Sequence, residues 1–374
     1  MMAERANKRW TTDDQELERF LAEAQEFKGE SLWNDAWRRL RRNRSAWWAL
    51  LFLAVFASLS FLAPVLPLRS PVVTQLEKTH HAPESVWGDQ GFMSAVEVGG
   101  KLEAADIERA YWDLNALDRG MVHLRMSVFG RWQTGNWMGT DQLGRDILSR
   151  IVWGSRTSIL VALAATLCSL MIGVVYGAFS GLVGGRTDNF MMRVVDILYS
   201  IPFIFVVIFV ITLIGDYRVL LEEKIGLDRE KIFYVVIGAI YWLTMARVVR
   251  GQVLSLKNSE FIEAARVLGA STRRILFAHI VPNVLSIVIV YLTLTIPAIM
   301  LFEAFLSFLG LGIEPPKVSW GTLANDGTAA INPLRIFWWL VVFPAMAMGS
   351  TLLALNILGD GMRDALDPKM RGKD

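Results

Sequence analysis

Six apolar runs constrain this chain more than any other feature of its sequence. A helix needs about 20 residues to cross the hydrocarbon core of a bilayer, and hydrophobic residues make up 53% of the 374-residue chain. Lipid offers no water to backbone polar groups, so such runs must be helical. The sequence therefore predicts an all-α integral membrane protein with six transmembrane helices, near residues 46–66, 157–183, 200–215, 232–249, 284–312 and 336–358. The third run is short, and we expect residues 189–200 to extend it.

Arginines in front of the first run predict how the chain sits in the bilayer. Basic residues concentrate on the cytoplasmic side of membrane proteins, and five precede this run without an intervening acid: Arg38, Arg39, Arg41, Arg42 and Arg44. We therefore expect both termini and the loop after the fourth run to be cytoplasmic. That loop is also basic, with Glu260 and Glu263 set against Arg247, Arg250, Lys257, Arg266, Arg273 and Arg274. The first run starts too far into the chain for a cleavable signal peptide and should remain as an anchor.

These expectations divide the chain into five parts. They are a cytoplasmic N-terminal region (1–45), a first transmembrane helix (46–66), an external, periplasmic region (67–153), a core with five transmembrane helices (154–363) and a cytoplasmic tail (364–374).

A basic amphipathic stretch lies just before the first span, at residues 30–44. Its predicted apolar face consists of Leu32, Trp33, Ala36, Trp37 and Leu40. We expect this helix to lie on the cytoplasmic membrane surface; binding of the kind seen in calmodulin targets is the alternative.

The cytoplasmic loop at 259–283 predicts a compact helical unit. Helical spacing puts four apolar residues in one stripe, Phe261, Ala264, Ala265 and Leu268. Ser259 is placed to cap this helix, and Gly269 to end it in a left-handed turn. Ser271 is placed to cap a second short helix, and Pro282 to close the unit. Such a unit between two spans favours docking of a partner protein; a helix-turn-helix for DNA is the alternative, although the neighbouring spans leave it no free domain.

Several residues inside the apolar runs have predicted roles. Gly173, Gly177 and Gly181 recur at four-residue steps and favour close helix packing. Pro297 and Pro344 favour kinks, either as hinges or as static bends. Glu303 is expected either to line or gate a pathway, or to form a hydrogen bond at an interface between two permease chains.

Motifs for catalysis and for binding nucleotides or metals are missing from the sequence. It contains no phosphate-binding loop, GxSxG, HExxH or CxxC pattern, and one cysteine, Cys168. The four histidines do not have metal-ligand spacing, and a net charge of +2 does not suggest nucleic acid as a partner. We predict a chain that is not an enzyme and binds no cofactor or metal itself.

Four segments resemble the permeases of ABC importers. Glu263-Ala264-Ala265, Gly269 and Pro282 fit the spacing of that family's "EAA loop", and His279 to Asn283 is similar to its peptide-transporting branch. Segments 139–156, 305–312 and 359–368 also resemble the family. The resemblance covers residues 31–70 and 136–370, and residues 71–135 are longer than it predicts.

The resemblance implies a type I ABC importer (MetI-like) permease core, with an external insertion between the first two spans. This chain would be the C-type subunit, forming half of the pathway for oligopeptides or dipeptides in a bacterial plasma (inner) membrane. Its implied partners are a second homologous permease, an extracytoplasmic peptide-binding protein, which the insertion would contact, membrane lipid, and two ATPase subunits that bind ATP and Mg. No nucleic acid is implied. The residues that would couple to the ATPases are Glu263, Ala264, Ala265, Gly269, His279 and Pro282. A permease for nickel chelates or other small solutes is the alternative, and a self-sufficient channel or secondary transporter is the rival class.

Overall fold

The structure is a computed structural model that describes residues 32–84, 93–95, 111, 114–130, 132–215, 223–224 and 229–366. Within them, five helices are long and apolar enough to cross a membrane, or six if a bent pair counts as one span. The predicted all-α membrane fold is confirmed. The five long helices are α3 (Arg44–Phe61), α6 (Ile147–Val183), α10 (Arg229–Leu256), α13 (Val281–Phe308) and α15 (Trp339–Leu366).

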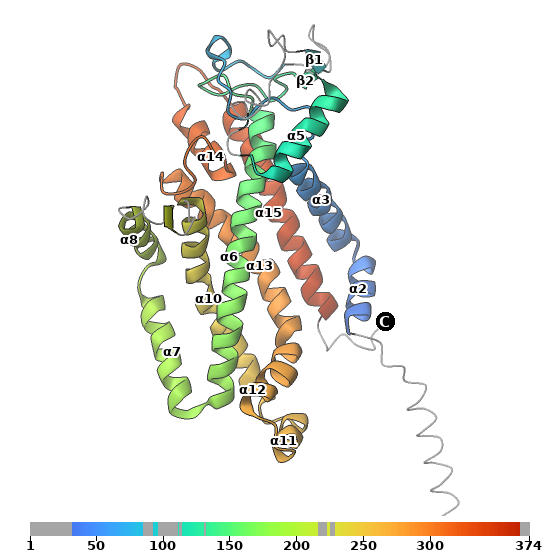
Figure 1. Cartoon of the computed structure of the whole chain (residues 1–374), viewed down its shortest axis with the longest axis vertical. Helices are drawn as coiled ribbons and strands as arrows, with labels where there is room; N and C mark the ends of the chain where they lie inside the picture. Colours follow the sequence, from blue (N-terminus) through green and yellow to red (C-terminus); the bar gives the residue numbers. More distant parts are fainter. Residues whose placement is uncertain are drawn as a thin grey trace, which may run out of the picture.

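These spans form one bundle (Figure 1), in which α6 packs on α10, α13 and α3, and α15 packs on α3 and α13. One end of the bundle carries α11 (Glu260–Val267), α12 (Thr272–Arg274) and α2 (Leu32–Arg42). We call this the α11 end. The opposite end, the α14 end, carries α5 (Ala116–Phe129) and α14 (Trp320–Ala329). The predicted cytoplasmic loop and both described ends of the chain thus lie at the same end of the bundle.

The third span is broken into two helices. α7 (Gly185–Ser200) and α8 (Phe203–Gly215) meet at an angle of 84°. Residues 189–200 do lead into the predicted run, but they do not continue it in a straight line. Proline disfavours a helical conformation in the residue before it, and Ile201, which precedes Pro202, is extended with φ −84° and ψ 125°.

The interface between α6 and α10 depends on three glycines of α6. A Cβ atom at Gly177 would lie 2.2 Å from the carbonyl oxygen of Ala246, and one at Gly173 would lie 2.6 Å from the Cβ of Met245. Gly181 faces Val253 in the same way, at 3.0 Å. The two backbones therefore approach more closely than any side chain at these positions would allow.

The amphipathic helix α2 packs on the bundle through part of its predicted apolar face. Ala36 and Leu40 are buried together with Ala46 of α3 and Ala365 of α15. Trp37 stays exposed, and the Arg41 guanidinium lies 5.0 Å from the centre of its ring. The side chains of Leu32 and Trp33, like residues 1–31, lie outside the part of the chain that the structure describes. The expectation of a helix resting on lipid thus needs correction for Ala36 and Leu40, which contact protein.

The α14 end contains small elements that the sequence did not predict. β1 (Met93–Ala95) pairs antiparallel with β2 (Trp132–Thr134), and η1 (Leu76–Lys78) is a short 3-10 helix. α14 forms between the fifth and sixth predicted runs, and Ser319 and Thr322 form its capping box. Much of the long insertion falls outside the described residues, namely 85–92, 96–110, 112–113 and 131.

An ion-paired cluster fixes α14 to the start of α6. The Arg150 guanidinium contacts the carboxylates of Asp141, at 2.6 Å, and Asp326, at 3.0 Å. Arg145 pairs with the same Asp141, at 2.7 Å. These buried polar contacts explain why α6 begins at Ile147, ten residues before the apolar run. The cap of α6 is Asp146, which accepts the N–H of Ser149 at 2.7 Å.

Candidate functional site at the α10–α13 loop

The loop between α10 and α13 folds into a compact helical unit. α11 ends at a turn in which Gly269 has a φ of +78°, a left-handed conformation that glycine adopts without steric penalty. Ser271 then caps α12 by accepting the N–H of Arg274 at 3.4 Å. Ser259 precedes α11, but its hydroxyl donates to a carbonyl of α10, at 2.6 Å, and does not cap α11.

Apolar side chains on the inner side of α11 attach this unit to the bundle. Ile262 is fully buried and Ala265 is buried beside it. They belong to a core cluster that also contains Ile280, Ala178 of α6 and Val253 of α10. Because such packing is dense and resists deformation, α11 is attached firmly to two spans.

The outer side of α11 is apolar and exposed. Phe261, Val267 and Leu268 are all exposed, Leu268 to 86%, and Ala264 is exposed between them. Clustered exposed apolar side chains mark contact sites for other molecules. The predicted stripe is therefore partly wrong: Ala265 faces the bundle, whereas Val267, which was not predicted, belongs to the exposed face.

Charged and turn residues border this apolar surface. Glu263 and Gly269 are exposed, as are three basic residues, Arg266, Arg273 and Arg274. An apolar centre with a charged rim is the usual anatomy of a protein–protein interface. The unit has the surface of a docking element.

Pro282 does not close the unit, contrary to the prediction. It lies in the first turn of α13, and residues 272–308 form one uninterrupted helix. The residues just before it, η2 (Ile275–Ile280), are π-helical, and the Val281 N–H bonds to the carbonyl of Leu276, five residues earlier. A widened turn accommodates the missing N–H of a proline. The unit is thus continuous with the fifth span.

His279 lies within η2 and is half-buried. Its carbonyl accepts a hydrogen bond from the side-chain amide of Asn283, at 2.6 Å. His279 therefore sits at the join between the loop and α13, away from the exposed apolar face of α11.

Glu303 lies inside this chain, in contact with α6 and with its own helix. Its side chain is 1% exposed. It accepts hydrogen bonds from Ser158 of α6, at 3.1 Å, and from Ser307 of its own helix, at 2.8 Å. Ser158 in turn accepts the backbone N–H of Trp320, at the start of α14. Glu303 thus joins α13, α6 and α14 within one chain, which differs from the expected hydrogen bond between two permease chains; a role in lining or gating a pathway stays a prediction.

The two prolines inside spans leave their helices continuous. Pro297 is buried in α13, and the helix runs past it to Phe308. Pro344 is buried in α15. Near Pro297, the Tyr241 hydroxyl of α10 donates to the carbonyl of Ala298, at 3.2 Å. Pro297 therefore lies in a region of α13 that is held against α10.

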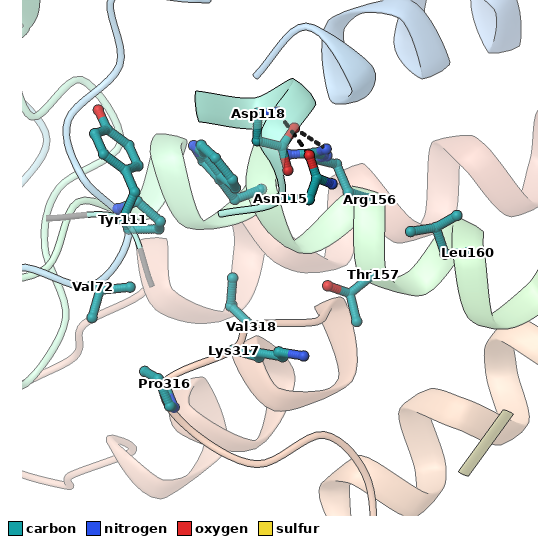
Figure 2. A pocket seen from close by; sticks show the side chains of 12 residues that line it. Val72, Tyr111, Asn115, Asp118, Arg156, Thr157, Leu160, Pro316, Lys317 and Val318 are labelled. Carbon is teal, nitrogen blue, oxygen red and sulfur yellow. Dashed lines mark hydrogen bonds and ion pairs between the residues drawn. The ribbon is translucent and has the colours of Figure 1, made fainter. Parts of the chain in front are cut away.

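A cavity of about 200 Å³ lies at the α14 end, between the start of α5, the start of α6 and the segment before α14 (Figure 2). Its charged lining includes Asp118 and Arg156, which pair at 2.7 Å, and Lys317. Figure 2 shows this pair at the edge nearest α5, with Thr157 and Leu160 further along α6. Among the described residues, no group of three or more His, Cys, Asp or Glu is placed to hold a metal ion. The cavity thus offers no evident catalytic or metal chemistry.

Sequence reasoning missed several residues that the structure brings together. Asp326 joins the Arg150 cluster from a distant part of the chain, and Asp196 of α7 pairs with Arg247 of α10 at 2.9 Å. Isolated acids in a sequence carry no signal of their partners. A charge within an apolar run, as at Arg247, was the one sign available.

Taken together, a bundle of apolar spans and a firmly attached docking loop define a multi-pass membrane protein that works with another protein. Comparison with known families gives the same class. A family model described as "Binding-protein-dependent transport system inner membrane component" matches residues 173–372, and one described as "N-terminal TM domain of oligopeptide transport permease C" matches residues 31–83.

Full-length relatives are similar over nearly the whole chain. The oligopeptide transport system permease protein OppC of Haemophilus influenzae is 40% identical over 349 residues, which cover 93% of this chain and 92% of the relative. The OppC of Escherichia coli is 40% identical over 355 residues, 95% and 97% of the two chains. The dipeptide transport system permease protein DppC of Bacillus subtilis is 37% identical over 364 residues, 97% and 93%. The chain belongs to the family of binding-protein-dependent transport system inner membrane components, the permeases of ABC importers. It is a transport component rather than a catalyst.

Proposed function

We propose that this chain is one of two homologous permease subunits of a bacterial ABC importer for oligopeptides or dipeptides. The names of the relatives support the substrate class. The arginines before α3 and the basic α10–α13 loop support a plasma membrane orientation with the α11 end in the cytoplasm. A second permease would complete the pathway, and a peptide-binding protein would deliver solute at the α14 end.

The exposed face of α11 is the observation that carries this proposal. Its apolar residues, with Leu268 86% exposed, would fit a groove of a separate ATPase subunit as a helix fits a groove. Glu263 would supply a charge at the edge of this contact, and Gly269 the turn that presents it. ATP and Mg would be bound by the two ATPase subunits alone.

The attachment of the loop gives a mechanism for coupling. Closure of the ATPases would move α11, and the buried Ile262 would carry this movement into α6 and α10. The continuous helix 272–308 would carry it into α13. The bundle would then switch between inward and outward openings, which is coupling between distant sites through a two-state element.

The test is transport by the complete importer in proteoliposomes, with peptide uptake and ATP hydrolysis measured together. We expect Leu268→Asp to uncouple hydrolysis from uptake or to release the ATPases, because it puts a charge into the apolar contact. We expect the same of Glu263→Arg and of Gly269→Leu. The matched control is Leu334→Asp, since Leu334 is 90% exposed at the opposite end of the bundle; it should leave the ATPases bound on purification and the ratio of peptide taken up to ATP hydrolysed unchanged.

Two outcomes would count against the proposal. Full coupling in the Leu268→Asp importer would dismiss α11 as the ATPase contact. Uptake of a nickel chelate but of no peptide by the unaltered importer would dismiss the substrate class.

A further inference from the structure

The break between α7 and α8 exposes non-helical backbone within a span. Ser200, Ile201 and Pro202 are all exposed. At 1.5 Å per residue, Ser200 lies about 22 Å along α7 from its start at the α11 end, near the middle of residues 185–213, which pass as one apolar span when the bent pair is counted as one. Non-helical backbone within a span is tolerated where protein buries it or where it lines a water-filled cavity.

An exposed ion pair lies one helical turn from this break. Asp196 of α7 and Arg247 of α10 are 2.9 Å apart, and their side chains are 61% and 39% exposed. The Arg247 guanidinium also lies 4.2 Å from the centre of the Tyr199 ring. Charged groups within spans face a bundle interior or water, because contact with hydrocarbon is unfavourable. The break and the ion pair thus independently indicate that this face does not contact lipid.

A second ion pair between the same helices shows that Asp196 and Arg247 are not needed to join them. Asp188 of α7 is buried and accepts two hydrogen bonds from Arg250 of α10, both at 2.6 Å. Ser180 of α6 donates to the same carboxylate, at 2.6 Å. This buried pair fixes α7 to α10 and α6, whereas the exposed pair presents its charges outward.

The Arg247 side chain is held in place with hydrogen-bond donors to spare. Asp196 accepts from one terminal nitrogen, Nη2, and the Tyr199 ring covers the guanidinium from one side. A guanidinium has five N–H donors in a fixed plane and binds carboxylates through two parallel hydrogen bonds. The donors that Asp196 does not use remain available to a carboxylate from the open side.

We propose that this face of α7 and α10 lines a water-filled part of the solute pathway, and that Arg247 binds the C-terminal carboxylate of the passing peptide. This inference rests on the proposed function and names the contact that recognises its substrate class. Asp196 and Tyr199 position Arg247 for that contact.

The experiment compares uptake of one peptide with a free C-terminus and the same peptide with a C-terminal amide. Importers carrying Arg247→Gln are measured beside the unaltered complex, with the binding protein saturated by each peptide. The ratio of the two uptake rates is then compared between complexes, which cancels any preference of the binding protein. Arg186→Gln, an exposed arginine at the start of α7, is the matched control.

We expect Arg247→Gln to lower uptake of the free peptide about tenfold, as for a lost charged hydrogen bond, and to abolish the difference between the two peptides. The double variant Asp196→Arg with Arg247→Asp restores an ion pair with reversed placement; we expect it to leave assembly intact and uptake impaired. An unchanged ratio in Arg247→Gln would overturn the role of Arg247. Loss of the second permease on purification of Arg247→Gln would instead assign this face to the contact between the two permeases, and would also overturn the inference.

A second measurement needs no peptide transport. In a Cys168→Ala background, Ser200→Cys should react with a water-soluble thiol reagent, and a bound peptide should slow that reaction. An unreactive thiol would overturn the water-filled face. If the unaltered importer takes up no peptide at all, the proposed substrate class fails and Arg247 loses its assigned ligand, while the thiol reaction still decides whether this face is wet. Alternatively, the unaltered importer takes up peptide normally and Arg247→Gln leaves the ratio of free-peptide to amidated-peptide uptake unchanged. In that case the proposed function stands and this inference alone fails.

Discussion

Single buried polar side chains hold distant parts of this chain together. Glu303 connects α13 to α6 and, through Ser158, to the first residue of α14. The hydrogen bonds that it accepts come from the hydroxyl groups of Ser158 and Ser307. A carboxyl group buried in this way contributes to stability through its hydrogen bonds. Its position argues for a structural role rather than a gating role.

Replacement of Glu303 tests this role. Glu303→Gln keeps the shape and can still accept hydrogen bonds, so we expect a loss of stability below about 1 kcal/mol. Glu303→Leu leaves the two serine hydroxyls without their acceptor, and we expect a loss of about 2 kcal/mol or more. Thermal unfolding of the purified subunit would measure both. Near-normal stability of Glu303→Leu, with transport abolished in both variants, would instead restore a direct role in the pathway.

Asp146, which caps α6, is a second buried acid. Burial raises its pKa from the ordinary 3.8 to about 7, against the hydrogen bond from Ser149 and the charge of Arg69, which lower it. The carboxyl group is therefore protonated in the folded protein at pH values at which it would be ionised in the unfolded chain. Its contribution to stability is fully present below about pH 4 and is lost as the pH rises through about 7.

The expected consequence is a pH-dependent unfolding temperature. Between about pH 5 and pH 7, each pH unit should remove up to about 1.4 kcal/mol of stability. Asp146→Asn mimics the protonated form and remains a good helix cap, so its unfolding temperature should fall less over the same range. Parallel pH profiles for the two proteins would contradict the assignment.

At the scale of elements, glycines allow α6 and α10 to approach each other closely: a Cβ at Gly177 would lie 2.2 Å from the carbonyl oxygen of Ala246. Three glycines on one face of α6 let the α10 backbone approach, so the pair acts as one rigid unit that also carries the α11 loop. Small residues serve this purpose in membranes, where helices gain nothing from expelling lipid.

Adding a methyl group at a glycine inside this contact, and at one outside it, should distinguish the effect of helix packing from the effect of helix propensity. Gly177→Ala would place its Cβ 2.2 Å from the carbonyl oxygen of Ala246, and we expect a loss of about 1–3 kcal/mol from overpacking. Gly251→Ala, in α10, has no atoms within 4 Å of the new Cβ and should gain up to about 1 kcal/mol from helix propensity. Unfolding temperatures and purification yields of the two variants would show the difference. Equal behaviour of the two would mean that the helices can move apart freely.

The elements also show what the sequence could and could not predict. Spans were predictable because hydropathy is a local property, and the Gly269 turn because only its own backbone decides it. The 84° break at Pro202, the π-helical turns before Pro282 and the helix α14 were not predicted, since they depend on packing against other elements. The partners of Glu303 lie up to 145 residues away along the chain, and no local pattern indicates them. Asp196 and Arg247 are similar, because neither residue alone suggests an ion pair.

At the scale of the whole molecule, the bundle has two distinct ends. The α11 end carries the docking loop and both described chain ends, whereas the α14 end carries α5, α14 and the two short strands (Figure 1). Each end has a highly exposed leucine, Leu268 and Leu334. The proposed orientation puts the first in the cytoplasm and the second outside.

Thiol labelling would test this orientation directly. In a Cys168→Ala background, and in cells that lack the ATPase subunits that would cover Leu268, a membrane-impermeant maleimide should label Leu334→Cys on intact cells and Leu268→Cys on inverted membrane vesicles alone. Both leucines are exposed to a similar degree, so access and not burial decides the result. Labelling of Leu268→Cys from outside would overturn the orientation and, with it, the role of α11 in contacting a cytosolic ATPase.

The packing of α3 against α15 has a consequence for how the chain is made. Ala46 fits against Gly361, where an added Cβ would lie 2.3 Å from the Ala46 methyl group, and α2 contacts the same stretch of α15 through Leu40. A ribosome completes α3 some 300 residues before α15. α3 therefore reaches the membrane before α15 has been made, so the contact between them can form only late in the biogenesis of this bundle.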